Sequence, residues 1–308
     1  MLSGRLLLWA LLWLCSGFPA SAAEHFSDHE EFCQREPATP CLQFIRQQRD
    51  ELPAQSVAWF KLTSYQLDYL YDKHQFSELL QQTEQLLQLP DLPPVFRTQL
   101  YFYHAKMLNA AGRLVQAQHY AELASVQLSE LYRAFADPLR MLELANLQTV
   151  FGAQDSAWTL LLAAEQRFGK SKDPIFGFEL NSNKALVQHA RGKLEDAAYY
   201  RKLALDAILP SGHPGKIIVA YGNLARTHQL LGQLGLAVNY YEKSLSYMRK
   251  DLDAVLQSTH LLRLAELYDQ LQDRHSAQRY LQQVEPQLLS DGHRALHRAL
   301  TATKPRAG

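Results

Sequence analysis

The stretch that decides the fold is NLARTHQLLGQLGLAVNYYEKSL, residues 223–245. Taken alone, it gathers Asn223, Arg226 and His228 ahead of a glycine, which could be a catalytic cluster or a ligand pocket. When the chain is shifted by 40 residues, however, the same residue types return in register. The columns are Ala105, Ala145, Ala185, Ala225 and Ala265; Gly112, Gly152, Gly192 and Gly232, with Gln272 in the fifth place; Ala117, Ala157, Ala197, Ala237 and Ala277; and Tyr120, Leu160, Tyr200, Tyr240 and Tyr280. Columns that stay in register over several copies identify a repeat array.

Each repeat is predicted to be a hairpin of two helices, called helix A and helix B below. The first alanine lets the two helices approach closely, and the glycine falls where helix A ends, a position that commonly needs a left-handed backbone. The second alanine is the contact point on helix B, and the aromatic residue three positions later lies on the same face. Prolines fall between the hairpins, where a helix must stop and restart: Pro90, Pro93, Pro94, Pro138, Pro174, Pro210 and Pro214. A single hairpin leaves an apolar face uncovered, so the hairpins must stack.

The quoted stretch resembles the tetratricopeptide repeat, whose core reads N-L-A/G-x-x-Y-x-x-x-G-x-x-x-x-A-x-x-x-Y-x-x-A-L. Residues 183–205 and 263–286 also match, although His228 replaces the usual tyrosine and Lys184 and Gln188 stand at apolar positions. The period of 40 exceeds the family's usual 34 residues and is similar to the elongated repeats of kinesin light chains and of bacterial regulator sensor regions. The resemblance implies an all-α, right-handed superhelix (α-solenoid) of about six hairpins with a C-terminal capping helix.

The repeats and the two ends predict the domain organisation. Residues 1–23 form a signal peptide, residues 24–54 an N-terminal segment, residues 55–290 the repeat array, and residues 291–308 a capping helix and tail. The hairpins are placed at about 55–90, 95–133, 137–170, 174–210, 215–250 and 254–290.

The first residues have the pattern of a secretory signal. Arg5 precedes a short apolar run, and small residues follow, so cleavage after Ala22 or Ala23 fits equally well. Two alternatives remain open, a lipid-modified Cys15 and an uncleaved membrane anchor; the first lacks the small residue that should precede the cysteine. The signal predicts a periplasmic or secreted protein with no stable membrane insertion after cleavage.

Export also explains the cysteines. Cys33 and Cys41 have seven residues between them, and an oxidising compartment favours a local disulfide at this spacing. A metal site is the alternative, but it would need further ligands nearby, and none is evident in the sequence.

The resemblance places the binding surface of such proteins on their concave face, which is lined by helix A of each repeat. The residues carried over to this face are Lys106, Asn109, Asn146, Asn183, His189, Asn223, Arg226, Gln229, Arg263 and Glu266. In peptide-binding members, an asparagine in the register of Asn183 and Asn223 grips a ligand's backbone amide. The alternative is that these residues are solvated helix faces. No carboxylate clamp is predicted, because the cations are scattered and Leu186 interrupts them.

Other function classes find little support in the sequence. Lysine plus arginine equals aspartate plus glutamate, 31 against 31, so no net charge attracts nucleic acid. No phosphate loop, nucleophile elbow, metalloprotease helix or dinucleotide fingerprint occurs. The pairs His25 with His29 and His293 with His297 could bind a metal, but solvated termini explain them more simply.

The sequence therefore predicts a non-enzymatic interaction protein without a cofactor. Its partner would be another protein or a peptide, bound in the cell envelope by the concave face. A periplasmic sensor that binds a short peptide or small ligand and changes its superhelix pitch is the alternative. The oligomeric state stays open.

Overall fold

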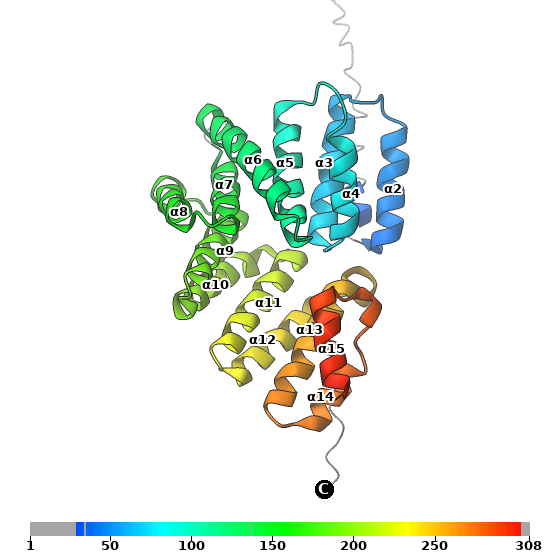
Figure 1. Cartoon of the computed structure of the whole chain (residues 1–308), viewed down its shortest axis with the longest axis vertical. Helices are drawn as coiled ribbons and strands as arrows, with labels where there is room; N and C mark the ends of the chain where they lie inside the picture. The colour runs from blue at the N-terminus through cyan, green and yellow to red at the C-terminus, as the bar shows by residue number, and fades with distance from the viewer. Residues whose placement is uncertain (1–28, 34, 136, 303–308) are drawn as a thin grey trace, which may run out of the picture. The chain divides into compact units, whose positions relative to one another are not determined.

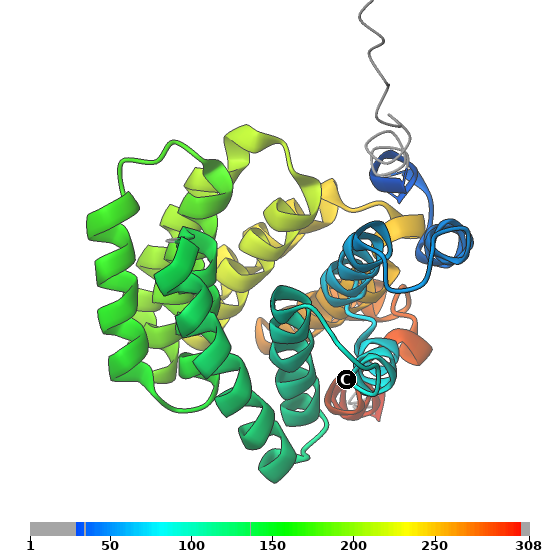
Figure 2. The same ribbon diagram turned by 90° about the horizontal axis from the view of Figure 1, so that it is seen from above.

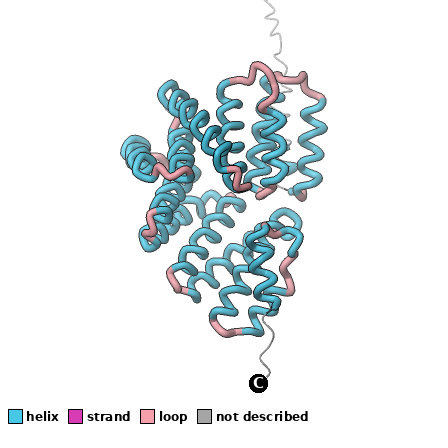
Figure 3. The backbone as a smooth tube through the Cα atoms, viewed as in Figure 1, coloured by secondary structure: helices cyan, strands magenta, loops and turns pink. Residues whose placement is uncertain are grey.

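A computed structural model describes residues 29–33, 35–135 and 137–302 of the chain, and within these residues the regular structure is helical throughout (Figures 1 and 3). The predicted signal peptide, its cleavage site, His25 and the tail after residue 302 lie outside this range. None of the described helices combines the length and the apolar character that a membrane crossing requires. The described chain divides after Leu62 into two compact units.

The α-solenoid prediction is confirmed in the second unit, where A and B helices alternate along the chain (Figure 1). The A helices are α3 (Val57–Asp72, which begins in the first unit), α5 (Pro94–Ala110), α7 (Pro138–Val150), α9 (Pro174–Ala190), α11 (Pro214–Leu230) and α13 (Lys250–Gln270). The B helices are α4 (Phe76–Leu86), α6 (Leu114–Phe135), α8 (Gln154–Phe168), α10 (Leu194–Ile208), α12 (Leu234–Tyr247) and α14 (Arg274–Leu281). The helix α15 (Asp291–Ala302) follows the last hairpin and contacts α13.

Proline and side-chain caps set where the A helices begin. Pro138, Pro174 and Pro214 each occupy the first helical position, where their missing N–H group is not needed. Asp137 and Asp173 precede two of them and accept hydrogen bonds from the backbone N–H groups of Leu139 and Ile175, both at 2.9 Å. The turns before α7, α9 and α11 are therefore encoded locally.

The alanine columns form the contacts between paired helices. Each alanine of the first column, from Ala105 to Ala265, is at most 1% exposed, and the first four of the second column are fully buried. Larger side chains from neighbouring hairpins fill the space around them, as in the cluster of Met141, Leu161 and Phe176. The core is consequently continuous from one repeat to the next, as a stacked array requires.

The glycine column ends the A helices as predicted. Gly112, Gly152, Gly192 and Gly232 have φ angles of 75°, 91°, 74° and 72°, all in the left-handed region. Gln272 takes the fifth place with φ 62°, a conformation that a residue with a Cβ atom adopts only at a cost.

Replacing Gln272 with glycine is expected to raise the free energy of unfolding by about 0.5–1 kcal/mol. Relief of the left-handed backbone exceeds the extra freedom that glycine gives the unfolded chain. Denaturant unfolding measures the change. The control is Gln278→Gly within α14, which should destabilise by about 1 kcal/mol because its backbone is helical. A loss of stability with Gln272→Gly would contradict the strain argument.

The first unit contains a helix that the repeat pattern did not predict, α2 (Ala38–Asp50). Cys41 lies in α2 and is joined by a disulfide to Cys33, with the two Cα atoms 4.9 Å apart. Beside this link the rings of Phe32 and Phe44 stack with centroids 4.4 Å apart. The disulfide thus fastens the N-terminal segment locally.

Lys184, which replaces the usual leucine, is buried without any rotation of its helix. The neighbouring Ala185 keeps its buried place in the alanine column, and the Lys184 side chain is only 2% exposed. Its Nζ atom lies 2.6 Å from a carboxylate oxygen of Glu165 on α8. The rings of Tyr200 and Trp158 lie 5.3 Å and 5.9 Å from the same ammonium group. An ion pair with aromatic surroundings therefore replaces an apolar contact between α8 and α9.

Within the second unit, the first and last A helices meet. Seen from above, the helices of this unit follow one another around a curve (Figure 2). Lys73, at the end of α3, places its Nζ atom 2.9 Å from Asp253 Oδ1 at the start of α13. Asp253 is the non-helical residue within α13, so the kink in that helix coincides with this contact.

Candidate functional site

Polar side chains from three successive A helices form a continuous hydrogen-bond chain. Lys106 Nζ on α5 donates to Asn146 Oδ1 on α7 at 3.2 Å, and Asn146 Nδ2 donates to Asn183 Oδ1 on α9 at 2.7 Å. Asn183 in turn donates to the backbone carbonyl of Glu179 at 2.9 Å. The structure therefore joins three of the predicted concave residues, which we call the asparagine ladder (Lys106, Asn146 and Asn183).

A second network joins the C-terminal A helices. Arg226 donates to Gln229 Oε1 at 2.8 Å, and Gln229 donates to Glu266 Oε2 at 2.9 Å. Arg263 reaches the same carboxylate oxygen at 2.8 Å and lies 3.1 Å from His293 Nε2. Four more of the predicted residues thus act together, although they satisfy much of one another's hydrogen bonding.

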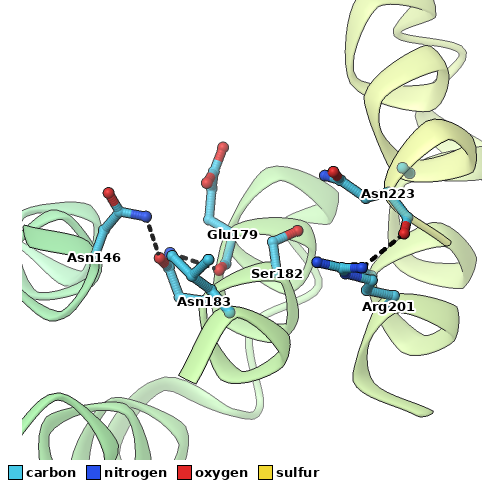
Figure 4. Close-up of a pocket in the computed structure, with 9 residues that line it drawn as sticks. Asn146, Glu179, Ser182, Asn183, Arg201 and Asn223 are labelled. Atoms are coloured by element: carbon cyan, nitrogen blue, oxygen red, sulfur yellow. Dashed lines mark hydrogen bonds between the residues drawn. The ribbon is translucent and has the colours of Figure 1, made fainter. Parts of the chain in front are cut away.

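A cavity of about 160 Å³ opens beside the asparagine ladder (Figure 4). Asn183 and Asn223, the pair expected to grip a peptide backbone, both line it. The walls come from α7, α9, α10 and α11: Asn146, Glu179, Ser182, Asn183, Leu186, Arg201, Ala204, Ala220 and Asn223. Leu186 and the two alanines give the cavity an apolar part, so it combines hydrogen-bonding groups with a hydrophobic wall.

Arg201 is the lining residue that sequence reasoning missed. It belongs to α10, a B helix, whereas the resemblance directs attention to A helices. Its Nη1 atom donates to the backbone carbonyl of Asn223 at 2.8 Å and contacts the hydroxyl of Thr227. Figure 4 shows its guanidinium pointing from α10 toward the other lining side chains. The only sequence signal is its position beside Tyr200 in the aromatic column.

Within the described chain, the side chains of the remaining predicted residues, Asn109, His189 and Asn223, take no part in these two networks. Asn109 is half-buried near the end of α5. His189 has a buried Nδ1 atom without a hydrogen-bond partner. Burial and the nearby charges of Arg201 and Arg226 lower the pKa of His189, so its neutral form is favoured. His189 is therefore a neutral group close to two cations, Arg201 and Arg226.

Carboxylates with raised pKa values occur on α3 and α7, two A helices in the N-terminal part of the array. Asp68 accepts hydrogen bonds from Tyr103 Oη at 2.6 Å and Gln99 Nε2 at 2.8 Å. Although Asp68 is solvent-accessible, the surrounding walls remove part of its hydration and raise its pKa. Loss of hydration also raises the pKa of Glu143, even though Arg140 binds it at 2.6 Å. No motif in the sequence indicated these acidic groups.

The groups of this arrangement are suited to binding a polar ligand. Amide, hydroxyl and guanidinium groups offer hydrogen bonds to an extended chain or a small polar ligand. Throughout residues 29–33, 35–135 and 137–302, no group of three histidine, cysteine or acidic side chains has the geometry to hold a metal ion. His293 contacts Arg263, which assigns this histidine a place in the second network.

Comparison with known proteins agrees with the repeat pattern. Residues 218–251 match the family model of the tetratricopeptide repeat. No curated protein sequence matches the chain.

Solved structures show the same fold at low sequence identity. A Rap protein complexed with Competence and Sporulation Factor aligns with a TM-score of 0.58 and 12% identity over 90% of this chain and 78% of that one. NprR in complex with its cognate peptide NprX aligns with a TM-score of 0.53 and 12% identity over 91% and 81%. A tetratricopeptide repeat protein from Parabacteroides merdae ATCC 43184 gives 0.50 and 11% over 91% and 99%. The chain therefore contains a tetratricopeptide repeat and has the fold of tetratricopeptide repeat proteins.

Proposed function

We propose that this chain is an exported, non-enzymatic interaction protein that binds a peptide segment of another protein along its A helices. The observation that carries the proposal is the cavity that Asn183 and Asn223 line together, next to a ladder of polar side chains from three repeats. Packed helices lie about 8–10 Å apart, so side chains on neighbouring A helices can hydrogen-bond backbone groups about three residues apart in an extended chain. NprR, which shares the fold, holds a cognate peptide, and this gives the proposal its ligand class.

The exported setting rests on the sequence pattern of residues 1–23 and is supported by the cysteine chemistry. A disulfide such as Cys33–Cys41 persists in the periplasm or outside the cell and is rare in the reducing cytosol. We therefore place the partner in the cell envelope or in the medium.

Site-specific photo-crosslinking tests the binding surface. A photoreactive residue at position 223, on the cavity wall, should capture a partner from cell-envelope extract. The same group at position 239, an exposed site on α12, should not. Equal capture at both positions would contradict the proposed surface.

Substitution should complement the crosslinking. The triple variant Asn183→Ala, Asn223→Ala and Arg226→Ala is expected to reduce partner capture at least tenfold, because it removes three of the side chains proposed to hydrogen-bond a ligand. Its matched control removes two amides and one cation from exposed B-helix positions: Asn239→Ala, Gln278→Ala and Lys243→Ala. Thermal melting of both variants separates lost binding from lost folding. Unchanged capture by the folded triple variant would overturn the assignment.

A sensor for a short peptide or small molecule is the second candidate. The polar groups and the apolar wall of the cavity could hold a ligand, but its volume of about 160 Å³ is below the roughly 300–1,000 Å³ of sites that enclose drug-sized ligands, so only a very small molecule or one residue of a peptide would fit inside. Thermal stabilisation by size-fractionated extract distinguishes the two functions. Stabilisation confined to the low-mass fraction would favour the sensor over the scaffold.

A further inference from the structure

Arg201 presents a positive charge to the cavity with part of its guanidinium unused. Only its Nη1 atom makes a hydrogen bond within the described chain, to Asn223 and Thr227. The Nε and Nη2 donors are left for a ligand, since a guanidinium carries five N–H groups in a fixed planar fork. The contacts to Asn223 and Thr227 tie the side chain to α11, so its position is set before any ligand arrives.

No carboxylate neutralises Arg201, in contrast to three cations on neighbouring A helices. Arg140 is paired with Glu143 at 2.6 Å, Lys216 with Glu179 at 2.7 Å, and Arg263 with Glu266 at 2.8 Å. Across the described residues, none of the aspartate or glutamate oxygens lies within ion-pair distance of Arg201. Burial lowers the pKa of Arg201 to about 10, the direction expected for a cation that has lost water without gaining a counter-charge.

The other lining groups suit a single small anion. Glu179, the one acid in the wall, is already held by Lys216, so it does not compete for Arg201. Ser182, Asn183 and Asn223 supply neutral hydrogen-bonding groups around the same space. The cavity of about 160 Å³ has room for several water molecules at roughly 30 Å³ each. This volume suits one side chain or one chain end of a peptide.

We propose that the cavity beside Arg201 is a subsite for one carboxylate of the bound peptide, either an Asp or Glu side chain or the C-terminal carboxylate. The inference rests on the proposed peptide-binding function and names the chemistry that this site selects. Arg201 binds the carboxylate through its free donors, because a guanidinium matches a carboxylate in shape and charge. The cation comes from a B helix of a single repeat, so it differs from the multi-repeat clamp that the sequence excluded.

Three defined peptide pools test this subsite and separate the two sources of the carboxylate. The first pool has amidated C-termini and lacks Asp and Glu, the second lacks Asp and Glu but ends in a free carboxylate, and the third is amidated but contains Asp and Glu. Immobilised full-length protein is incubated with each pool, and retained peptides are quantified by mass spectrometry. The second or the third pool should be retained at least tenfold better than the first, and the favoured pool identifies the source.

Variants assign the preference to Arg201. Arg201→Gln should abolish the difference between the pools, and Arg201→Lys, which keeps the charge without the fork, should preserve it with weaker retention. Arg201→Lys also keeps the test decisive if Arg201→Gln does not fold. The matched control is Lys202→Gln, which removes an exposed, Asp206-paired cation from the next position of α10 and should change nothing.

The outcomes separate this inference from the proposed function. Equal retention of all three pools, insensitive to Arg201→Gln but reduced by Asn223→Ala, would overturn the carboxylate subsite and leave peptide binding intact. Failure of the native protein to retain any pool would overturn both.

Discussion

Replacing Glu165 with glutamine is expected to lower the free energy of unfolding by about 2 kcal/mol. The substitution leaves the ammonium group of Lys184, which is 2% exposed, without its counter-charge. Breaking a fully buried pair from one side costs about 3–5 kcal/mol. We expect less here, because Glu165 is half-exposed and the rings of Tyr200 and Trp158 still face the cation.

Replacing the lysine of this ion pair should not destabilise the protein. Lys184→Leu removes the buried charge and restores the residue type usual at this position of the repeat, so stability should stay unchanged or rise by about 1 kcal/mol. Denaturant unfolding measures both variants. The matched control is Asp206→Asn, which breaks the ion pair between Lys202 and Asp206. The carboxylate of Asp206 is 49% exposed, like that of Glu165, but Lys202 is half-exposed. This substitution should lower the free energy of unfolding by less than about 0.5 kcal/mol. Equal losses for Glu165→Gln and Asp206→Asn would show that the burial of Lys184 is not the cause.

Acidification from pH 7 to pH 5 is expected to destabilise the protein, with His260 contributing about 2 kcal/mol. Burial, with a smaller contribution from the charge of His74, lowers the pKa of His260 to about 3. In the unfolded chain His260 binds a proton near pH 6.5, so above that pH the ring is neutral in both states and folding carries no cost from it. As the pH falls from 6.5 toward 3, the free energy of unfolding decreases by about 1.4 kcal/mol per pH unit, because only the unfolded chain is protonated at His260.

The substitution His260→Leu should remove this part of the pH dependence, whatever its effect on stability at pH 7. The ring contacts Tyr241 at a centroid distance of 5.0 Å and has a buried Nδ1 atom without a partner, so no hydrogen bond is lost. Unfolding at pH 7 and pH 5 should be compared for both proteins. The raised pKa values of Asp68, Asp72 and Glu143 act in the opposite direction, because folding favours their protonated forms. An unchanged difference between the two pH values in His260→Leu would contradict the assignment.

The fold could be predicted because its determinants recur at a fixed spacing. From Ala105 onward, the first alanine column sets the contact between the paired helices of five repeats, and glycine ends helix A in four of them. The helix α2 could not be found in this way, because it lies outside the period.

The site could be predicted only where it follows the same period. Lys106, Asn146 and Asn183 occur on successive A helices, so the resemblance identified them and the structure links them. Arg201 was missed because its role depends on packing between α10 and α11, which brings a B-helix side chain to Asn223. The burial of Lys184 likewise depends on a partner in the preceding repeat, Glu165, which no local pattern indicates.

The contact between Lys73 and Asp253 is expected to change how this repeat array unfolds. In a linear array each repeat touches only its neighbours, so the terminal repeats fray first and unfolding can spread inward from either end. Here one ion pair links the residue after the first A helix to the start of the last across 180 residues, so we expect both ends to fray less than in an open array. The second unit is therefore connected as a loop of contacts rather than a line, and its repeats are coupled into a more cooperative unfolding unit.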